Sequence, residues 1–323
     1  MNKVIGVKSV DFSVVASGSG AVNYNGKVSV KGDKGTELKN HIMPKLRGYS
    51  NESGKIKEEN GYRYKKKATE VCFKENPLYI SQNCIRHHLF KDQSHDFHFA
   101  SKEGSDKDPK KLLISVSGLL RGYVIPRTQN KRTSPLLIED FVDQLGNGNF
   151  EQFGNSGEKG SNSIYSKTTF GETQYFAKGS ISIEQLQFIS LDKKFDREAL
   201  IVSDQDKGFA LAKELTEFLQ ELDPVSDLNP VAEFGEYYRV GSIYQEPEVG
   251  ILLNNDAISI LVDLMLELIS DLSIKQAKGW MSVDSVNVDY NNSSTMMRIA
   301  KDPENVNSEL TEDFAVYYKK VEA

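Results

Sequence analysis

The chain has 323 residues, of which 38% are hydrophobic and 27% are charged, and its formal net charge is −6 at pH 7. This composition is typical of a globular protein, and we expect one elaborated domain over residues 1–323. No apolar run approaches the ~18 residues needed to cross a membrane, and the first residues lack a signal-peptide pattern. We therefore expect a cytoplasmic protein that does not bind membranes. Cys72 and Cys84 lack zinc-like spacing, so we expect two reduced thiols.

The charge is distributed unevenly along the chain. Residues 39–74 and residues 107–135 each carry +6, whereas residues 198–274 carry −13. This separation favours a basic face, and local potential governs polyanion binding. Two alternatives stay open: the charges are spread over a solvated surface, or the acidic part meets the basic part of a neighbouring copy head to tail.

The first half of the chain alternates predicted strands with polar insertions. Lys3–Ala16 alternates apolar and polar residues and predicts a strand, and Gly18–Gly35 predicts a hairpin. Residues 40–74 are basic with little periodicity, which is typical of an inserted finger or subdomain.

A strand that runs into a helix is predicted over Leu78–Phe90. Ser81 stands where it can cap the helix, and Arg86 lies one turn in. The first amides of a helix have no partner within the helix, so this start predicts an anion site for a phosphate. An ordinary capped helix with a solvated arginine is the alternative.

A second helix start is predicted after Lys131 and Arg132. Ser134 has the position of an N-cap and Pro135 that of the first residue of a helix over Pro135–Leu145. The cationic pair would lie beside the free amides, so an anion would meet charge and helix dipole together.

The rest of the chain predicts further strands and two long helices around a glycine-rich excursion. The predicted strands are Leu112–Val116, Leu119–Ile125, a hairpin turning at Gly171, a core strand within Gly179–Asp192, and Lys275–Tyr290. The predicted helices are Phe209–Leu222 and Asp256–Leu272, the latter largely buried. Strands interleaved with packed helices indicate an α+β domain.

The sequence patterns that would indicate an enzyme are weak. Four histidines and two aspartates lie close together in residues 87–98: His87, His88, His95, His98, Asp92 and Asp96. Their spacing fits no recognised zinc pattern. Asp140 and Asp143 could hold a divalent ion beside a phosphate, although an exposed helix face is the simpler reading. No glycine-rich segment continues into Gly-Lys-Ser/Thr, so a nucleotide-binding P-loop is unsupported. We expect no catalytic residue, no metal and no cofactor.

Several motifs resemble one family as a set. Ile80-Ser81-Gln82…Arg86 is similar to a strand-to-helix Ser-Gln-x-x-Lys-Arg, with Ile85 at the position of the lysine. The other motifs are Lys131–Pro135, Leu145–Phe150, Ser166–Gly171 and Lys278-Gly279. On these, the chain resembles the Cas-seven family, the backbone subunit of type I CRISPR interference (Cascade) complexes, and most of all its type I-F variant form.

The resemblance implies an RRM-like (ferredoxin-like) palm with finger or web insertions and a protruding thumb. We map the finger or web onto residues 40–74 and the thumb onto residues 146–178. Related type III subunits cut RNA with an aspartate in the thumb-side loop. Gly146–Ser166 contains no aspartate, which disfavours catalysis here.

The resemblance also implies a non-catalytic subunit that polymerises along a CRISPR RNA and presents it for pairing with target DNA. Its partners would be that RNA, the target DNA strand, other copies of itself, an end-capping subunit at the 5′ handle and the endoribonuclease that processes the RNA. The alternatives are a metal-dependent RNase and a homopolymeric structural protein. The expected RNA-binding residues are Lys45, Arg47, Lys65, Lys66, Lys67, Ser81, Gln82, Arg86, His87, Arg121, Lys131, Arg132, Ser134, Lys167, Phe170 and Lys278.

Overall fold

Strand β1 (Ser9–Gly20) overlaps the strand predicted over Lys3–Ala16, and it lies at the centre of the larger sheet. It pairs antiparallel with β11 (Glu172–Ser182) on one side and with β16 (Gly279–Asn291) on the other. The inward side chains of β1, all fully buried, are those of Val10, Phe12, Val14 and Ala16. Gly179 of β11 is required by this packing, because a Cβ atom there would lie 2.1 Å from the ring of Phe12.

The larger sheet has seven strands in the order β15-β16-β1-β11-β8-β4, with β7 also paired to β11. The remaining strands are β4 (Tyr79–Ile80), β7 (Leu136–Ile138), β8 (Phe141–Asp143) and β15 (Ser273–Gln276). Helix α5 (Asn255–Ser270) packs against β16 and buries most of its apolar residues, as predicted. Its N-cap is Asn254, whose side chain accepts from the amide of Ala257 at 2.9 Å.

The smaller sheet has the order β12-β14-β13-β17 and is also antiparallel. Its strands are β12 (Phe188–Ser190), β13 (Ala232–Arg239), β14 (Glu248–Leu253) and β17 (Tyr318–Lys320). Helix α4 (Gln205–Leu222) packs on β13 and confirms the helix predicted at Phe209–Leu222. The two sheets with their helices confirm the predicted α+β class.

The computed structural model describes residues 4–24, 29–31, 37–39, 44–47, 72–92, 109–154, 164–242 and 246–321, with the main chain alone at 29–31, 37–39, 149–154 and 164–170. The shorter elements are β2 (Ser29–Lys31), β3 (Glu37–Lys39), α1 (Gln82–Phe90), α2 (Pro109–Leu113), a π-helix (Ser117–Arg121), β5 (Tyr123–Val124), β6 (Lys131–Arg132), β9 (Gly148–Gly154), β10 (Ile164–Phe170), α3 (Ile183–Gln187), α6 (Arg298–Lys301) and two 3-10 turns (Lys193–Phe195 and Pro303–Asn305).

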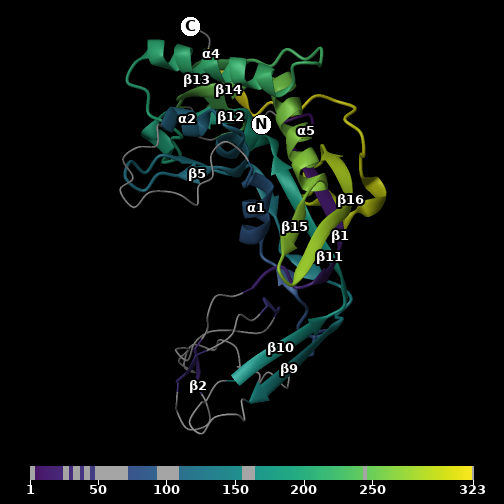
Figure 1. Cartoon of the computed structure of the whole chain (residues 1–323). Coiled ribbons are helices and arrows are strands. Elements are labelled where there is room, and N and C mark those ends of the chain that lie inside the picture. Colours follow the sequence, from purple (N-terminus) through teal and green to yellow (C-terminus); the bar gives the residue numbers. More distant parts are fainter. Residues whose placement is uncertain are drawn as a thin grey trace.

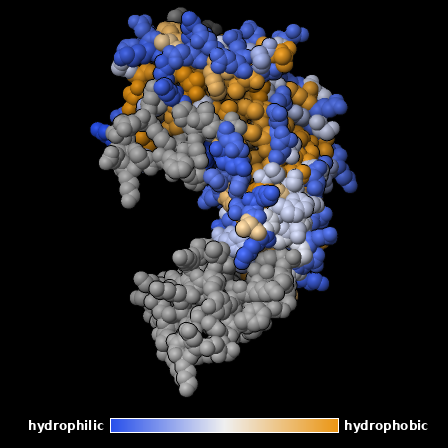
Figure 2. Space-filling model, in the orientation of Figure 1, coloured by the Kyte–Doolittle hydropathy of each residue, from blue (hydrophilic) through white to orange (hydrophobic). Residues whose placement is uncertain are grey.

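The long strands β1, β11 and β16 run along the middle of the molecule, between a lobe that carries α4 and a projecting hairpin of β9 and β10 (Figure 1). On the face shown in Figure 2, hydrophobic residues gather over the upper part, where α4, α5 and the smaller sheet come together. Among the described residues, no helix has the length and apolar character needed to cross a bilayer.

The helix predicted over Pro135–Leu145 is wrong, because this segment forms β7 and β8. Leu136 and Ile138 are buried while Leu137 is exposed, which is the two-residue period of a strand. β7 pairs with β11 and β8 pairs with both β11 and β4. Ser134 therefore caps no helix, and the second anion site does not exist as predicted.

Five other predicted segments also differ from the structure. Leu112–Val116 contains the end of α2 rather than a strand, and Leu119–Ile125 divides between the π-helix and β5, because a short apolar run does not distinguish strand from helix. Gly171 is no hairpin turn: β10 pairs with β9, and the chain continues from β10 into β11. Gly179–Asp192 divides among β11, α3 and β12, and in Gly18–Gly35 the β1 strand extends to Gly20 while the paired strands are β2 and β3.

A buried polar network ties α6 to the larger sheet. Arg298 donates from Nε to Asp289 at 2.9 Å, and the side chain of Asp289 is fully buried. Asp11 of β1 accepts from the amide of Arg298 at 2.9 Å and from the side chains of Ser180 and Asn291. The hydrogen bond with Asp289 is the largest cause that raises the pKa of Arg298.

We predict that Arg298→Met lowers the free energy of unfolding by about 3–5 kcal/mol, because it leaves the carboxylate of Asp289 buried without its cation. Chemical denaturation followed by circular dichroism measures the change. Lys301→Met, an exposed change in the same helix, is the control and should be nearly neutral. A loss below about 1 kcal/mol for Arg298→Met would contradict the assigned role of the pair.

Candidate nucleic-acid interface

Residues 44–47 lie beside the strand that leads into α1. Leu46 pairs antiparallel with Leu78, the amide of Tyr79 donates to the carbonyl of Lys45 at 3.1 Å, and the amide of Arg47 donates to the carbonyl of Pro77 at 2.9 Å. Leu46 and Leu78 are buried, which fixes this short pairing. It brings Lys45 and Arg47, from the basic segment of the sequence, to the start of α1.

The two cations lie around one aromatic ring. Lys45 Nζ is 5.8 Å from the ring centroid of Tyr79, and the guanidinium carbon of Arg47 is 5.4 Å from it. Lys45 Nζ also donates to Ser81 Oγ at 3.1 Å. The side chain of Arg47 is 49% exposed, so its charge is open to solvent. Cations beside an aromatic ring bind the phosphates and bases of single-stranded nucleic acid.

An internal carboxylate already occupies part of the predicted anion site. The amide of Gln82 donates to Asp140 Oδ1 at 2.8 Å, and Asp140 Oδ2 forms an ion pair with Arg47 at 3.1 Å. Ser81 makes no side-chain cap, and its amide donates to Asn23 Oδ1. Asp140 thus supplies the negative charge that a helix start favours. Ser81 is the N-cap residue of α1, as predicted, but its side chain makes no capping hydrogen bond.

Arg86 lies half-buried between α1 and the segment before β7. Its Nη1 donates to Ser134 Oγ at 2.9 Å and its Nη2 donates to the carbonyl of Leu136. Burial and the nearby charge of Arg121 both lower the pKa of Arg86. Among the described residues, no carboxylate lies within ion-pair distance of Arg86. The helix therefore carries positive charge behind its first turn.

The side chains of Lys131 and Arg132 lie in different environments. Lys131 forms an ion pair with Asp196 at 2.8 Å. Arg132 is 6% exposed, and its guanidinium donates to the carbonyls of Phe188 and Leu186. Arg132 therefore does not project from the surface beside a helix start, as its sequence position suggested.

A comparison with protein families identifies the chain. The family model described as Type I-Fv CRISPR-associated protein Cas7fv-like matches residues 6–321. The chain belongs to this family. A comparison with curated proteins finds none that matches. The family membership confirms the resemblance drawn from the motifs at Ser81, Lys131 and Lys278.

Among the other expected contact residues of this Cas7fv-like chain, His87 lies in the last turn of α1, and the charge of Arg121 lies close enough to Arg86 to lower its pKa. The remaining residues lie in other parts of the fold or outside the described residues. Lys65, Lys66 and Lys67 belong to the latter, and for Lys167 and Phe170 the main chain alone is described, in β10. Lys278 is exposed in the turn between β15 and β16. None of these predictions is tested here. Tyr79 and Asn23 were missed, and Asp140 was considered only as a metal ligand, because each is placed by pairing with a distant segment.

The metal-site hypothesis finds no cluster in the described part of the Cas7fv-like chain. Within that part, no group of three or more histidine, cysteine, aspartate or glutamate side chains is placed to hold an ion. Asp140 and Asp143 do not share a helix face as predicted. Asp143 is buried and accepts from the amides of Leu145, Gly146 and Gln174. His95, His98 and Asp96 lie outside the described residues.

We predict that His88 of α1 titrates with a midpoint near pH 4. Burial is the largest cause that lowers its pKa to about 4, followed by the charges of His87 and Lys91. Because the folded pKa lies below the usual value of about 6.5, this group's stability contribution is full above pH 6.5 and is lost as pH falls toward 4. NMR of the imidazole protons measures the midpoint, and His88→Gln assigns the signal. A midpoint near 6.5 would contradict the burial seen here.

Proposed function

We propose that this Cas7fv-like chain is an RNA-binding subunit whose copies line a CRISPR RNA and hold it for pairing with target DNA. The observation that carries the proposal is the cluster of Lys45, Arg47 and Tyr79 at the start of α1, in a chain that the family model matches over residues 6–321. The cluster offers charge and an aromatic face with no base-reading pattern, which suits recognition of an RNA backbone.

The β9–β10 hairpin supports the proposal that copies assemble along the RNA. It projects away from the lobe that carries α4 (Figure 1), and it corresponds to the first part of the predicted thumb at residues 146–178. A projecting hairpin on each copy is suited to reach over the next copy, which gives a head-to-tail, non-closing contact. An RRM-like palm, an end-capping partner at the 5′ handle and a processing endoribonuclease belong to the same proposal.

We also propose that the subunit does not cut RNA. Two carboxylates near the cationic cluster already have partners: Asp140 pairs with Arg47 of the cluster, and Asp143 accepts from three backbone amides. A metal-dependent RNase is the competing function. Incubation of labelled RNA with the protein and Mg²⁺ or Mn²⁺, followed by EDTA, separates the two, because cleavage that EDTA abolishes would establish the enzyme.

We predict that Lys45→Ala with Arg47→Ala weakens binding of single-stranded RNA regardless of sequence. Loss of two phosphate contacts should lower the slope of log K against log salt by about 1.4. Fluorescence anisotropy over a salt series, with two RNAs of unrelated sequence, measures both effects.

The control for this double variant is Lys207→Ala with Lys301→Ala, which removes the same charge from exposed positions on α4 and α6. The control should retain the salt slope. An equal loss of slope in both double variants would show that net charge, rather than the cluster at α1, drives binding.

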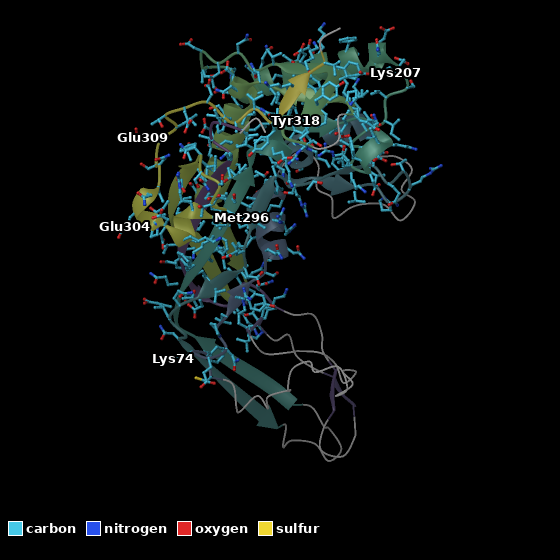
Figure 3. All side chains as sticks on the ribbon, turned by 180° about the vertical axis from the view of Figure 1, so that it is seen from behind. Lys74, Lys207, Met296, Glu304, Glu309 and Tyr318 are labelled. Carbon is cyan, nitrogen blue, oxygen red and sulfur yellow. The ribbon has the colours of Figure 1, made fainter. Side chains whose placement is uncertain are left out.

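We predict that Asp140→Asn strengthens RNA binding. Asparagine keeps an acceptor for the amide of Gln82 but removes the negative charge that competes with phosphate for Arg47 and the helix start. One unit charge about 4 Å away is worth roughly 1 kcal/mol in water, so we expect about fivefold tighter binding. Glu304→Gln, an exposed position labelled in Figure 3, is the matched charge control. Weaker binding by Asp140→Asn would place the RNA elsewhere.

A further inference from the structure

A small polar cavity lies where the smaller sheet meets residues 132–133 and the start of α3. Its volume is about 180 Å³, and the side chains that line it include Arg132, Thr133, Ser182, Ser190, Arg197 and Tyr318. Tyr318, labelled in Figure 3, marks its place on β17. The cavity does not belong to the cluster at α1, although Ser134, two residues after Arg132, accepts a hydrogen bond from Arg86.

Arg132 brings a buried positive charge to this cavity. Two of its nitrogens donate to the carbonyls of Phe188 and Leu186, which use two of its five N–H groups. Its Nε is buried and has no hydrogen-bond partner among the described residues. No carboxylate of the described residues forms an ion pair with it. A buried arginine in this condition is unusual, because buried charges are normally paired.

Arg197, whose own charge is paired with Glu248, lies on the same wall. Its guanidinium carbon lies 5.8 Å from the ring centroid of Phe188 and 5.9 Å from that of Tyr318, and these two rings stack with centroids 4.3 Å apart. Burial is the largest cause that lowers the pKa of Arg132 to about 10, and the charge of Arg197 lowers it further. Arg132 thus remains charged at pH 7.

The carboxylates beside the cavity each have an arginine of their own. Glu248 receives a two-pronged contact from Nε and Nη2 of Arg197. Glu184, which borders the cavity, accepts from Arg239 Nε. Neither of the two compensates the charge of Arg132.

We propose that this cavity is a phosphate-binding pocket. The guanidinium of Arg132 and the hydroxyl groups of Thr133 and Ser182 supply donors from two chain segments, more than the two oxygens of one carboxylate would use. A tetrahedral phosphate has enough oxygens for them, and arginine is the residue best suited to bind it. The phosphate is either free, alone or on a nucleotide, or part of a nucleic-acid backbone. The pocket stands independently of the function proposed above.

Thermal unfolding of the full chain in inorganic phosphate, against chloride at equal ionic strength and pH 7, tests the pocket. At phosphate tenfold above its Kd we expect the Tm to rise by about 2 °C. Phosphate also stabilises proteins by exclusion from their surface, so the readout is the difference between variants. Arg132→Met should abolish the specific rise, and Arg127→Met, an exposed arginine in the loop after β5, should keep it.

Thr133→Val keeps the test valid if Arg132→Met fails to fold. Thr133 is exposed, and the change removes one hydroxyl from the cavity at nearly constant shape. It should reduce the specific rise. The same rise in phosphate for wild type and all three variants would overturn the proposal. A rise of equal size in acetate would overturn it too, in favour of a site for an acidic protein segment.

A second experiment identifies the source of the phosphate: the thermal unfolding is repeated in the presence of mixed-sequence single-stranded RNA. If saturation with RNA removes the response to inorganic phosphate, the pocket takes a backbone phosphate; if the response persists, the pocket takes a free phosphate or nucleotide. Either outcome supports the pocket. Failure of the chain to bind RNA at all would refute the function proposed above while leaving the phosphate response in place.

Discussion

The antiparallel ladder formed by β1, β11 and β16 is the constraint on which the rest of the described structure depends. It joins an N-terminal strand to strands from the middle and the end of the sequence. The buried carboxylate of Asp11 in β1 accepts hydrogen bonds from both neighbouring strands and from α6, which ties these elements together. From β11 the sheet extends through β8 to β4, which delivers the chain into α1. The register of this ladder therefore fixes the position of β4 and, with it, the position of the cationic cluster at the start of α1.

Two buried arginines show how differently the same side chain is accommodated. Arg298 has a carboxylate, Asp289, and a hydrogen-bond network around it. Arg132 has backbone carbonyls and a cavity instead. A buried ion pair needs good geometry to offset desolvation, whereas an unpaired buried cation keeps a strong attraction for any anion that reaches it. The first arrangement serves the fold, and the second is suited to a ligand.

The start of α1 illustrates how a protein fills its own anion site. Asp140 contacts both the first amide of the helix and Arg47, the same groups that a phosphate would use. An internal anion of this kind stabilises the helix without a ligand. A polyanion that binds here has to replace the contacts of Asp140, so its binding free energy must exceed theirs. Because a nucleic-acid strand brings many phosphates at once, it can compete where a single small anion would not.

The sequence by itself determined the long elements and the family. β1, α4, α5 and β16 follow from apolar periodicity over a dozen or more residues, and Ser81-Gln82…Arg86 and Lys131–Pro135 pointed to the family that the comparison shows. The alternation of apolar residues at Leu136 and Ile138 is typical of the strand β7. The helix over Pro135–Leu145 was predicted instead, because Ser134-Pro135 resembles a helix N-cap followed by the first helical residue. Only the tertiary structure decided that Lys45 and Arg47 meet at Tyr79, that Asp140 occupies the helix start, and that Arg132 points inward. The reason is physical: periodicity acts between near neighbours, whereas burial and charge pairing depend on segments that pairing across a sheet brings together.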